Sequence, residues 1–163
     1  MNIILDHNQI NQKLKRIAYQ IYESNSNETE VILAGIANRG YDLAILLKSI
    51  LEEISPLDVS LCKVTVDKEN PINKIETSIN KSNYTNKSIV LVDDVLNSGT
   101  TLIYGVKHFL NVPLKRFKTA VLVNRNHKKF TVKADFKGIS LSTSLNEHVK
   151  VDLEQNNFKA YLI

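Results

Sequence analysis

Two adjacent acids and a group of small hydroxylated residues stand close together in the middle of the chain. From Ile89 to Thr101 the sequence reads IVLVDDVLNSGTT. The apolar run predicts a buried strand that delivers Asp93 and Asp94 to its exposed end. The turn that follows opens a helix, and the unpaired N–H groups at a helix start favour a bound phosphate. Gly99 permits close approach of a ligand, and the hydroxyls beside it add donors.

The two acids cannot hold the same phosphate, because like charges repel. They would serve something beside it: hydroxyl groups, a Mg²⁺ ion or a developing positive charge. A ligand with a phosphate at one end and a diol in its middle is a ribose 5-phosphate. The residue types alone therefore indicate a site for a phosphorylated ribose.

Hydrophobic periodicity predicts the elements that must position this stretch. Helical spacing runs from about Asn8 to Ser24, Tyr41 to Glu53 and Thr100 to Leu110. Strand patterns cover Val31–Ala34, Val59–Val66, Ser88–Val92 and Thr119–Val123, with a turn at Asp93–Gly99 and short strand-like pieces around Val132–Ala134, His148–Val151 and Ala160–Leu162. This order predicts an α/β fold, a mostly parallel sheet with helices on both faces.

In an open parallel sheet, ligands bind beyond the carboxyl ends of the strands. Three loops meet that condition: Gly35–Gly40, Asp93–Thr101 and Asn124–Phe130. The chain reads as a single domain over residues 1–163. Residues 67–87 are polar and carry little strand or helix signal, so we expect a flexible loop there.

The composition is that of an ordinary globular protein, with 43% hydrophobic and 23% charged residues and a formal net charge of +4. The lone cysteine, Cys62, excludes an internal disulfide framework and is expected to be a buried apolar residue. No apolar run approaches the roughly 18 residues of a membrane helix. The first residues show no signal-peptide pattern, so we expect a cytoplasmic protein without a membrane partner.

The stretch from Ile89 to Thr101 resembles the 5-phosphoribosyl-1-diphosphate (PRPP) motif of the type I phosphoribosyltransferases. A wider resemblance, to the bifunctional pyrimidine operon attenuator / uracil phosphoribosyltransferase family, covers nearly the whole chain apart from the region between Cys62 and Lys87. The segments that carry it are Ile4–Asp6, Lys15–Ala18, Leu33–Gly40, Val90–Leu96, Ala120–His127, Lys133–Phe136, Thr143–Ser144 and Val149–Val151.

The resemblance implies a type I phosphoribosyltransferase fold, with a small hood added to the sheet. It also implies an enzyme that transfers the phosphoribosyl group of PRPP to a pyrimidine base, with uracil giving UMP and pyrophosphate. Asp93, Asp94 and Arg39 would be catalytic, with Mg²⁺ as cofactor held directly or indirectly by the two acids. The implied binding residues are Asn97, Ser98, Gly99, Thr100 and Thr101 for the 5-phosphate, Ala37, Asn38, Arg39 and Gly40 for pyrophosphate, and Val95, Arg125 and His127 beside the base.

Two further features follow from the resemblance. A non-proline cis peptide is expected between Ile36 and Asn38, and Asp135 and Thr143 are expected in the hood. The sequence also departs from the family, because the flexible loop lacks the usual Arg-Asp-Asp segment. Lys63 or Lys68 would have to replace the missing arginine, as a point charge without a bidentate fork.

The resemblance leaves two alternative functions open. One is a UMP-sensing, RNA-binding regulator of pyrimidine genes with weak or no catalysis, and the other is a purine phosphoribosyltransferase. A basic face for RNA would combine the first helix with the region after the last core strand: Lys13, Lys15, Arg16, Arg125, Lys128 and Lys129. PRPP and a nucleobase are the implied small-molecule partners, and a homo-oligomer, a dimer or tetramer, is the implied assembly.

Overall fold

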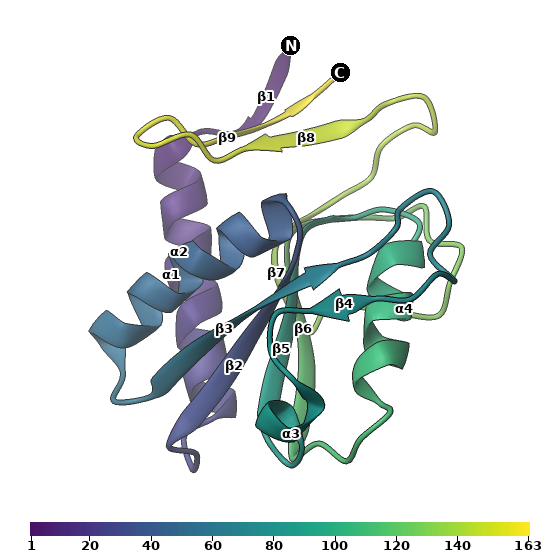
Figure 1. The fold of residues 1–163 in the computed structure, drawn as a ribbon. Helices are drawn as coiled ribbons and strands as arrows, with labels where there is room; N and C mark the ends of the chain where they lie inside the picture. Colours follow the sequence, from purple (N-terminus) through teal and green to yellow (C-terminus); the bar gives the residue numbers. More distant parts are fainter.

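The computed structural model describes residues 1–163, which form two sheets and four helices (Figure 1). The helices are α1 (His7–Ser24), α2 (Arg39–Ile54), α3 (Lys81–Tyr84) and α4 (Thr100–Phe109). The strands are β1 (Asn2–Leu5), β2 (Glu30–Ile36), β3 (Asp58–Thr65), β4 (Glu76–Thr77), β5 (Ser88–Leu96), β6 (Arg116–Arg125), β7 (Phe136–Leu141), β8 (Val149–Asp152) and β9 (Lys159–Leu162).

The larger sheet has the strand order β4-β3-β2-β5-β6-β7. Strands β3, β2, β5, β6 and β7 run parallel, and only β4 is antiparallel to its neighbour. The parallel strands therefore end at one edge, and β5 lies between β2 and β6. This confirms the predicted mostly parallel sheet.

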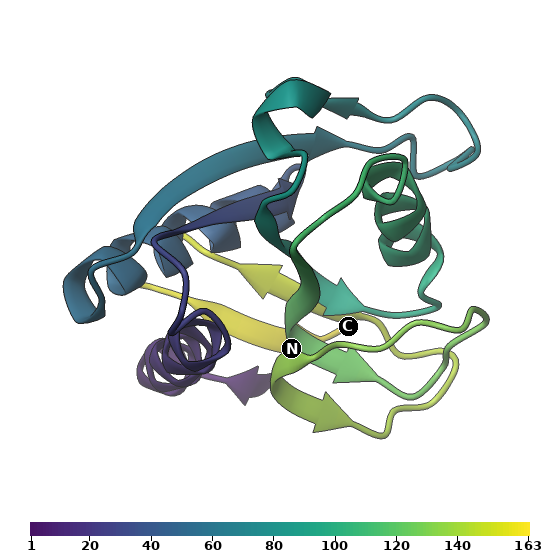
Figure 2. The same cartoon turned by 90° about the horizontal axis from the view of Figure 1, so that it is seen from below.

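Helices cover both faces of this sheet, as predicted (Figure 2). Helices α1 and α2 pack on one face around a core that includes Leu14, Leu47 and Val90. On the other face, α3 and α4 bury Tyr84, Leu102 and Phe109. The buried face of α1 consists of the five apolar residues that its period predicts: Ile10, Leu14, Ile17, Ala18 and Ile21.

The second sheet is the hood that the resemblance implied. It is antiparallel, has the order β1-β9-β8 and lies beyond one end of the main sheet (Figure 1). Strand β1 pairs with β9, so residues from the two ends of the sequence lie side by side. The sequence analysis missed β1, because four residues next to a helix cap carry too little pattern.

Two predicted strands need correction. Strand β5 does not stop at Val92 but continues through Asp93 and Asp94 to Leu96, because it still pairs with β6 there. No strand forms at Val132–Ala134, and β7 begins instead at Phe136. Residues 67–87 contain β4, α3 and a buried Tyr84, with turns between them. No helix is long and apolar enough to cross a membrane.

Candidate active site

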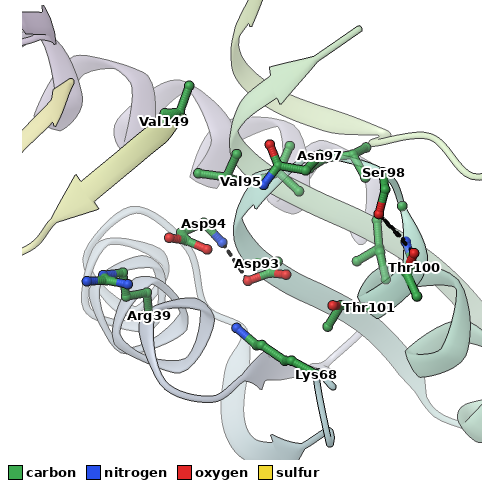
Figure 3. A pocket seen from close by; sticks show the side chains of 14 residues that line it. Arg39, Lys68, Asp93, Asp94, Val95, Asn97, Ser98, Thr100, Thr101 and Val149 are labelled. Atoms are coloured by element: carbon green, nitrogen blue, oxygen red, sulfur yellow. Dashed lines mark hydrogen bonds between the residues drawn. The ribbon is translucent and has the colours of Figure 1, made fainter. Parts of the chain in front are cut away.

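Most of the predicted site residues lie where β2 and β5 end and where α2 and α4 begin (Figure 3). Strand β5 pairs with β2 only as far as Val92, opposite Gly35, but with β6 as far as Leu96. Asp93 and Asp94 therefore lie on a part of β5 that is paired with β6 but no longer with β2. The first turn of α2 fills that space.

Glycine is required at position 40 for this arrangement. A Cβ atom there would lie 2.6 Å from the carbonyl oxygen of Val92 and 3.0 Å from Oδ1 of Asp93. The first distance is shorter than real Cβ contacts and the second is tighter than most of them, so any larger residue would push α2 away from the acids. Gly40, which was predicted to bind pyrophosphate, thus allows α2 to pack directly against Asp93.

The two acids have different surroundings. Asp93 is only 6% exposed, whereas Asp94 is half-buried and lines the space between Arg39 and Lys68. The backbone N–H of Asp94 donates to Oδ1 of Asp93 at 2.9 Å. Burial raises the pKa of Asp93 well above its ordinary value, the charge of Asp94 raises it further, and the charge of Lys68 opposes the shift.

A loop of small residues, Asn97–Thr101, leads from β5 into α4, and we call it the phosphate loop. Gly99 has a φ of 87° and is the N-cap of α4, a conformation that favours glycine. The hydroxyls of Ser98 and Thr100 lie 2.9 Å apart. The first N–H groups of a helix have no partner within it, so the loop presents donors to an anion.

The acids and the phosphate loop line one cavity of about 280 Å³. Its lining joins residues from five places in the chain: Arg39, Lys68, Asp93–Leu102, Val121 and Val149. The structure therefore brings together the two acids, Arg39, Val95 and the whole predicted 5-phosphate group. Val149 belongs to β8, so the hood contributes to the same cavity.

A second cavity, of about 680 Å³, adjoins the first and shares Arg39, Lys68 and Asp94 with it. Ala37 and Asn38 line it. The peptide bond between these two residues is cis, which confirms the predicted cis peptide. We call Ala37–Gly40 the pyrophosphate loop, after its predicted role.

Of the two lysines that the sequence left open, only Lys68 lines the cavities. Its side chain points toward Asp93 in Figure 3. The ammonium of Lys63 lies instead 5.6 Å from the ring centroid of Tyr41. No residue pattern distinguishes the two lysines, because the path of the chain after β3 decides which one reaches the site.

Arg125 and His127 line neither cavity, although both were predicted beside the base. The guanidinium of Arg125 is buried and donates to Asn97 and Thr143, and the ring of His127 contacts the carbonyl oxygen of Thr143. Asp135 also lies elsewhere, since its carboxylate accepts from the backbone N–H of Thr119. Thr143 is thus a partner of Arg125 in the connection to the hood.

Cys62 is buried, as expected, and burial raises the pKa of its thiol. The sequence analysis did not identify Leu96, Leu102, Val121 or Val149 as lining residues. The first three are ordinary core residues in sequence, and Val149 reaches the site only through the pairing of the hood strands.

Comparison with known proteins gives a consistent result. The phosphoribosyl transferase domain model matches residues 1–156. The chain is 33% identical to the bifunctional protein PyrR of Fusobacterium nucleatum, covering 100% of this chain and 97% of that protein. It is 34% identical to the bifunctional protein PyrR of Macrococcus caseolyticus, over 94% of this chain and 92% of the other.

Two solved structures share the fold at low sequence identity. The hypoxanthine phosphoribosyltransferase of Trypanosoma cruzi has a TM-score of 0.79 at 14% identity, covering 98% of this chain and 95% of its own. A hypoxanthine-guanine phosphoribosyltransferase of Bacillus anthracis has a TM-score of 0.77 at 19% identity, covering 100% and 97%. At these identities the likeness concerns the fold alone.

Proposed function

The chain belongs to the phosphoribosyl transferase domain family, together with the bifunctional PyrR proteins, and from this premise we propose that it transfers the phosphoribosyl group of PRPP to uracil. The products are UMP and pyrophosphate. One observation carries the proposal: Asp93 and Asp94 share a cavity with the phosphate loop. That cavity joins sites for a phosphate and for ribose hydroxyls.

The ribose is the centre of the reaction. The bond between its anomeric carbon and the pyrophosphate oxygen breaks, and a ring nitrogen of the base forms the new bond to that carbon and releases its proton to water or to the departing pyrophosphate. Positive charge develops on the ribose ring in the transition state. The acids at the end of β5 stabilise that charge while they hold the hydroxyls, because preorganised opposite charge acts strongly in a water-poor site.

The leaving pyrophosphate belongs in the second cavity. Ala37, Asn38 and Arg39 of the pyrophosphate loop line that space together with Lys68. Cations there balance the negative charge that the leaving group gains as its bond to the ribose breaks. Lys68 takes the place of the arginine that the family carries in the loop after β3.

Mg²⁺ fits this site. It binds proteins through one or two carboxylates together with substrate phosphates and waters, and Asp94 lines both cavities. When bound with PRPP, the ion would neutralise phosphate charge. Asp93 and Asp94 would hold it, directly or through water.

Pyrophosphate release tests the enzyme and its base. The protein is incubated with Mg²⁺, PRPP and uracil, hypoxanthine or guanine in separate reactions, and pyrophosphate is followed. We expect release with uracil only. Release with a purine alone would favour the purine alternative, whereas no release with any base would refute the enzyme.

The PyrR relatives are named bifunctional, and the resemblance described in the sequence analysis implies RNA binding as the second function. Lys15 and Arg16 are exposed on α1, and Lys128 and Lys129 are exposed after β6. We propose that these residues bind a structured leader RNA of pyrimidine genes, with UMP in the cavity as the regulatory ligand. Titration of such an RNA, with and without UMP, tests this.

Salt and charge provide the controls for RNA binding. Removing one cation that binds an RNA phosphate should lower the slope of log affinity against log salt by about one. Lys15→Glu should weaken binding, and Lys150→Glu, an exposed change in β8, should not. RNA binding that changes neither with salt nor with either substitution would contradict the proposal.

We also propose that the chain forms a dimer or tetramer, which light scattering would detect.

A further inference from the structure

Arg125 is a buried cation without a carboxylate partner. It ends β6 and is 5% exposed. The ion pairs of the molecule involve other cations: Lys48, Lys87, Lys115 and Arg116. Arginine is almost never fully buried unless it is paired, because removing a charge from water is costly. The environment of Arg125 therefore calls for a physical explanation.

Neutral acceptors hold the guanidinium in place. Nη1 donates to Oδ1 of Asn97 at 2.9 Å. Nε and Nη2 donate to Oγ1 of Thr143 at 2.9 and 2.8 Å. Nη2 also donates to the carbonyl oxygens of Ser144 at 3.2 Å and Glu147 at 2.6 Å. Every nitrogen has a partner, yet none of these partners carries a negative charge.

These acceptors belong to two segments, one that lines the first cavity and one that leads into the hood strand beside it. Asn97 opens the phosphate loop, which lines the cavity directly. Thr143–Glu147 connects β7 to β8, and β8 begins with Val149, which lines the same cavity from the hood. One side chain thus ties the phosphate loop to the base of the hood.

The segment Thr143–Glu147 depends on few other interactions. The backbone N–H of Ser144 donates to Oε2 of Glu147 at 2.7 Å, which closes the segment on itself. His127 contacts the carbonyl oxygen of Thr143. The remaining side-chain hydrogen bonds of the segment are those to Arg125, so this guanidinium is its main attachment to the sheet.

We infer that Arg125 is a positioning residue for the phosphate end of the substrate, an inference that rests on the proposed function. Acting through Asn97 and Thr143–Glu147, it fixes the phosphate loop against the hood. Arg125 has no carboxylate partner, so the phosphate of a bound phosphorylated ribose would balance its positive charge. Coulomb attraction between the two is strong where water is scarce.

Charge and shape can be separated at this position. Lysine keeps the positive charge but lacks the planar fork that reaches Asn97 and Thr143 together. Methionine keeps the approximate length and removes both. Arg125→Lys should therefore preserve phosphate affinity better than Arg125→Met, while both should loosen the segment that leads into the hood.

The experiment compares Arg125→Met, Arg125→Lys and a control, Arg116→Met, at the opposite end of β6. Calorimetry measures the affinity for ribose 5-phosphate, and amide hydrogen exchange follows residues 96–101 and 142–148 in the ligand-free chain. We expect Arg125→Met to lose about tenfold or more in affinity, and Arg125→Lys to recover most of it. Exchange should quicken in both segments for Arg125→Met and in 142–148 for Arg125→Lys, with no change for Arg116→Met.

Unchanged hydrogen exchange at residues 142–148 in a folded Arg125 variant would overturn the inference that Arg125 links the phosphate loop to the hood. Affinity that Arg125→Lys fails to recover would overturn the role of the charge. If Arg125→Met does not fold, the exchange rates of Arg125→Lys alone test whether Arg125 links the phosphate loop to the hood. A wild-type chain that binds neither ribose 5-phosphate nor PRPP would refute the proposed function. The exchange comparison would still test the structural link that Arg125 makes.

Discussion

At the residue scale, the neighbouring carboxylates of β5 have different environments although the sequence repeats the same amino acid. Asp93 is buried beneath Gly40, and Asp94 lies between the two cavities. Burial separates them, so substitutions of the two residues should have different consequences. Asp94 should matter mainly for turnover, and Asp93 for stability as well.

Replacing Asp94 with asparagine tests its catalytic role. The amide keeps the size of the side chain but removes the negative charge that, in the proposed mechanism, stabilises the developing cation on the ribose. We expect kcat for phosphoribosyl transfer to fall by about a hundredfold or more, with the fold intact. Asp58→Asn, an exposed change at the start of β3, is the matched control. Full turnover by Asp94→Asn would remove the residue from the mechanism.

Asp93→Asn should change the dependence of stability on pH. The pKa of Asp93 is raised in the folded protein above its ordinary 3.8, mainly by burial. The stability that goes with its proton is fully present below that ordinary value and is lost as pH rises through the folded-state pKa. Asparagine cannot lose this proton, so the variant should be more stable by about 1 kcal/mol or more at about pH 8.

Denaturant unfolding at several pH values measures this effect. The difference between Asp93→Asn and the wild type should shrink toward zero below about pH 3, where both the folded and the unfolded wild type hold the proton. Asp58→Asn should show no such convergence. A variant that is less stable at every pH would contradict the assignment of the buried acid.

Lys68 should contribute to PRPP binding through its charge. We expect Lys68→Ala to raise the KM for PRPP by about tenfold, because it removes a cation from the pyrophosphate side. Lys68→Arg should retain most of the affinity. Lys63→Ala is the control, since that ammonium lies against Tyr41. Equal effects of the two alanine substitutions would show that neither lysine has a specific role.

The sequence predicted the acids and the phosphate loop because their chemistry is concentrated in one continuous stretch. It did not distinguish Lys68 from Lys63 and did not reveal the burial of Arg125. Those properties depend on where distant segments fold back, such as Thr143–Glu147 onto the end of β6. Local spacing carries no information about such interactions.

At the element scale, the three long helices α1, α2 and α4 were predicted well, the short helix α3 was missed, and the strand ends were predicted poorly. Helix α1 has a complete signal, with five apolar residues on one face and a capping box between Asp6 and Gln9. Strand β5 was predicted too short, because two charged residues normally end a buried run. Pairing with β6 extends it, and that pairing is visible only in the sheet.

Two helical glycines provide a matched test of how α2 meets β5. Gly40→Ala would place a Cβ atom 2.6 Å from the carbonyl oxygen of Val92, where backbone blocks it. Gly105→Ala, in α4, would have its nearest contact with the flexible end of the Leu91 side chain, at 3.0 Å, and no backbone atom in its way. We expect Gly40→Ala to destabilise by about 2 kcal/mol or more and Gly105→Ala to stay within about 1 kcal/mol.

Thermal or denaturant unfolding gives both values. Gly40→Ala should also impair turnover, because it displaces the helix that carries Arg39. If both alanine variants unfold alike, the close approach of α2 to Asp93 is not what restricts position 40.

At the whole-molecule scale, two sheets and two cavities form one candidate site. The main sheet supplies the acids and both loops, and the hood supplies Val149. For ligand binding, the placement of the charged residues matters more than the net charge of +4. The acids lie on β5, and the cations lie on the surrounding loops and helix ends. The α/β class followed from the order of elements alone, whereas the hood followed only from the resemblance, because its strands are short and far apart in sequence.

The pairing of β1 with β9 has a consequence for folding kinetics. Asn2 lies opposite Leu162, so this pairing closes nearly the longest loop that the chain allows. Closing a long loop costs entropy before the paired strands can stabilise the fold, and such long-range pairings slow folding. The parallel sheet should therefore form before the hood. During refolding, amides of β5 should become protected early, and the ability to bind ribose 5-phosphate should appear only later, when the two ends of the sequence meet.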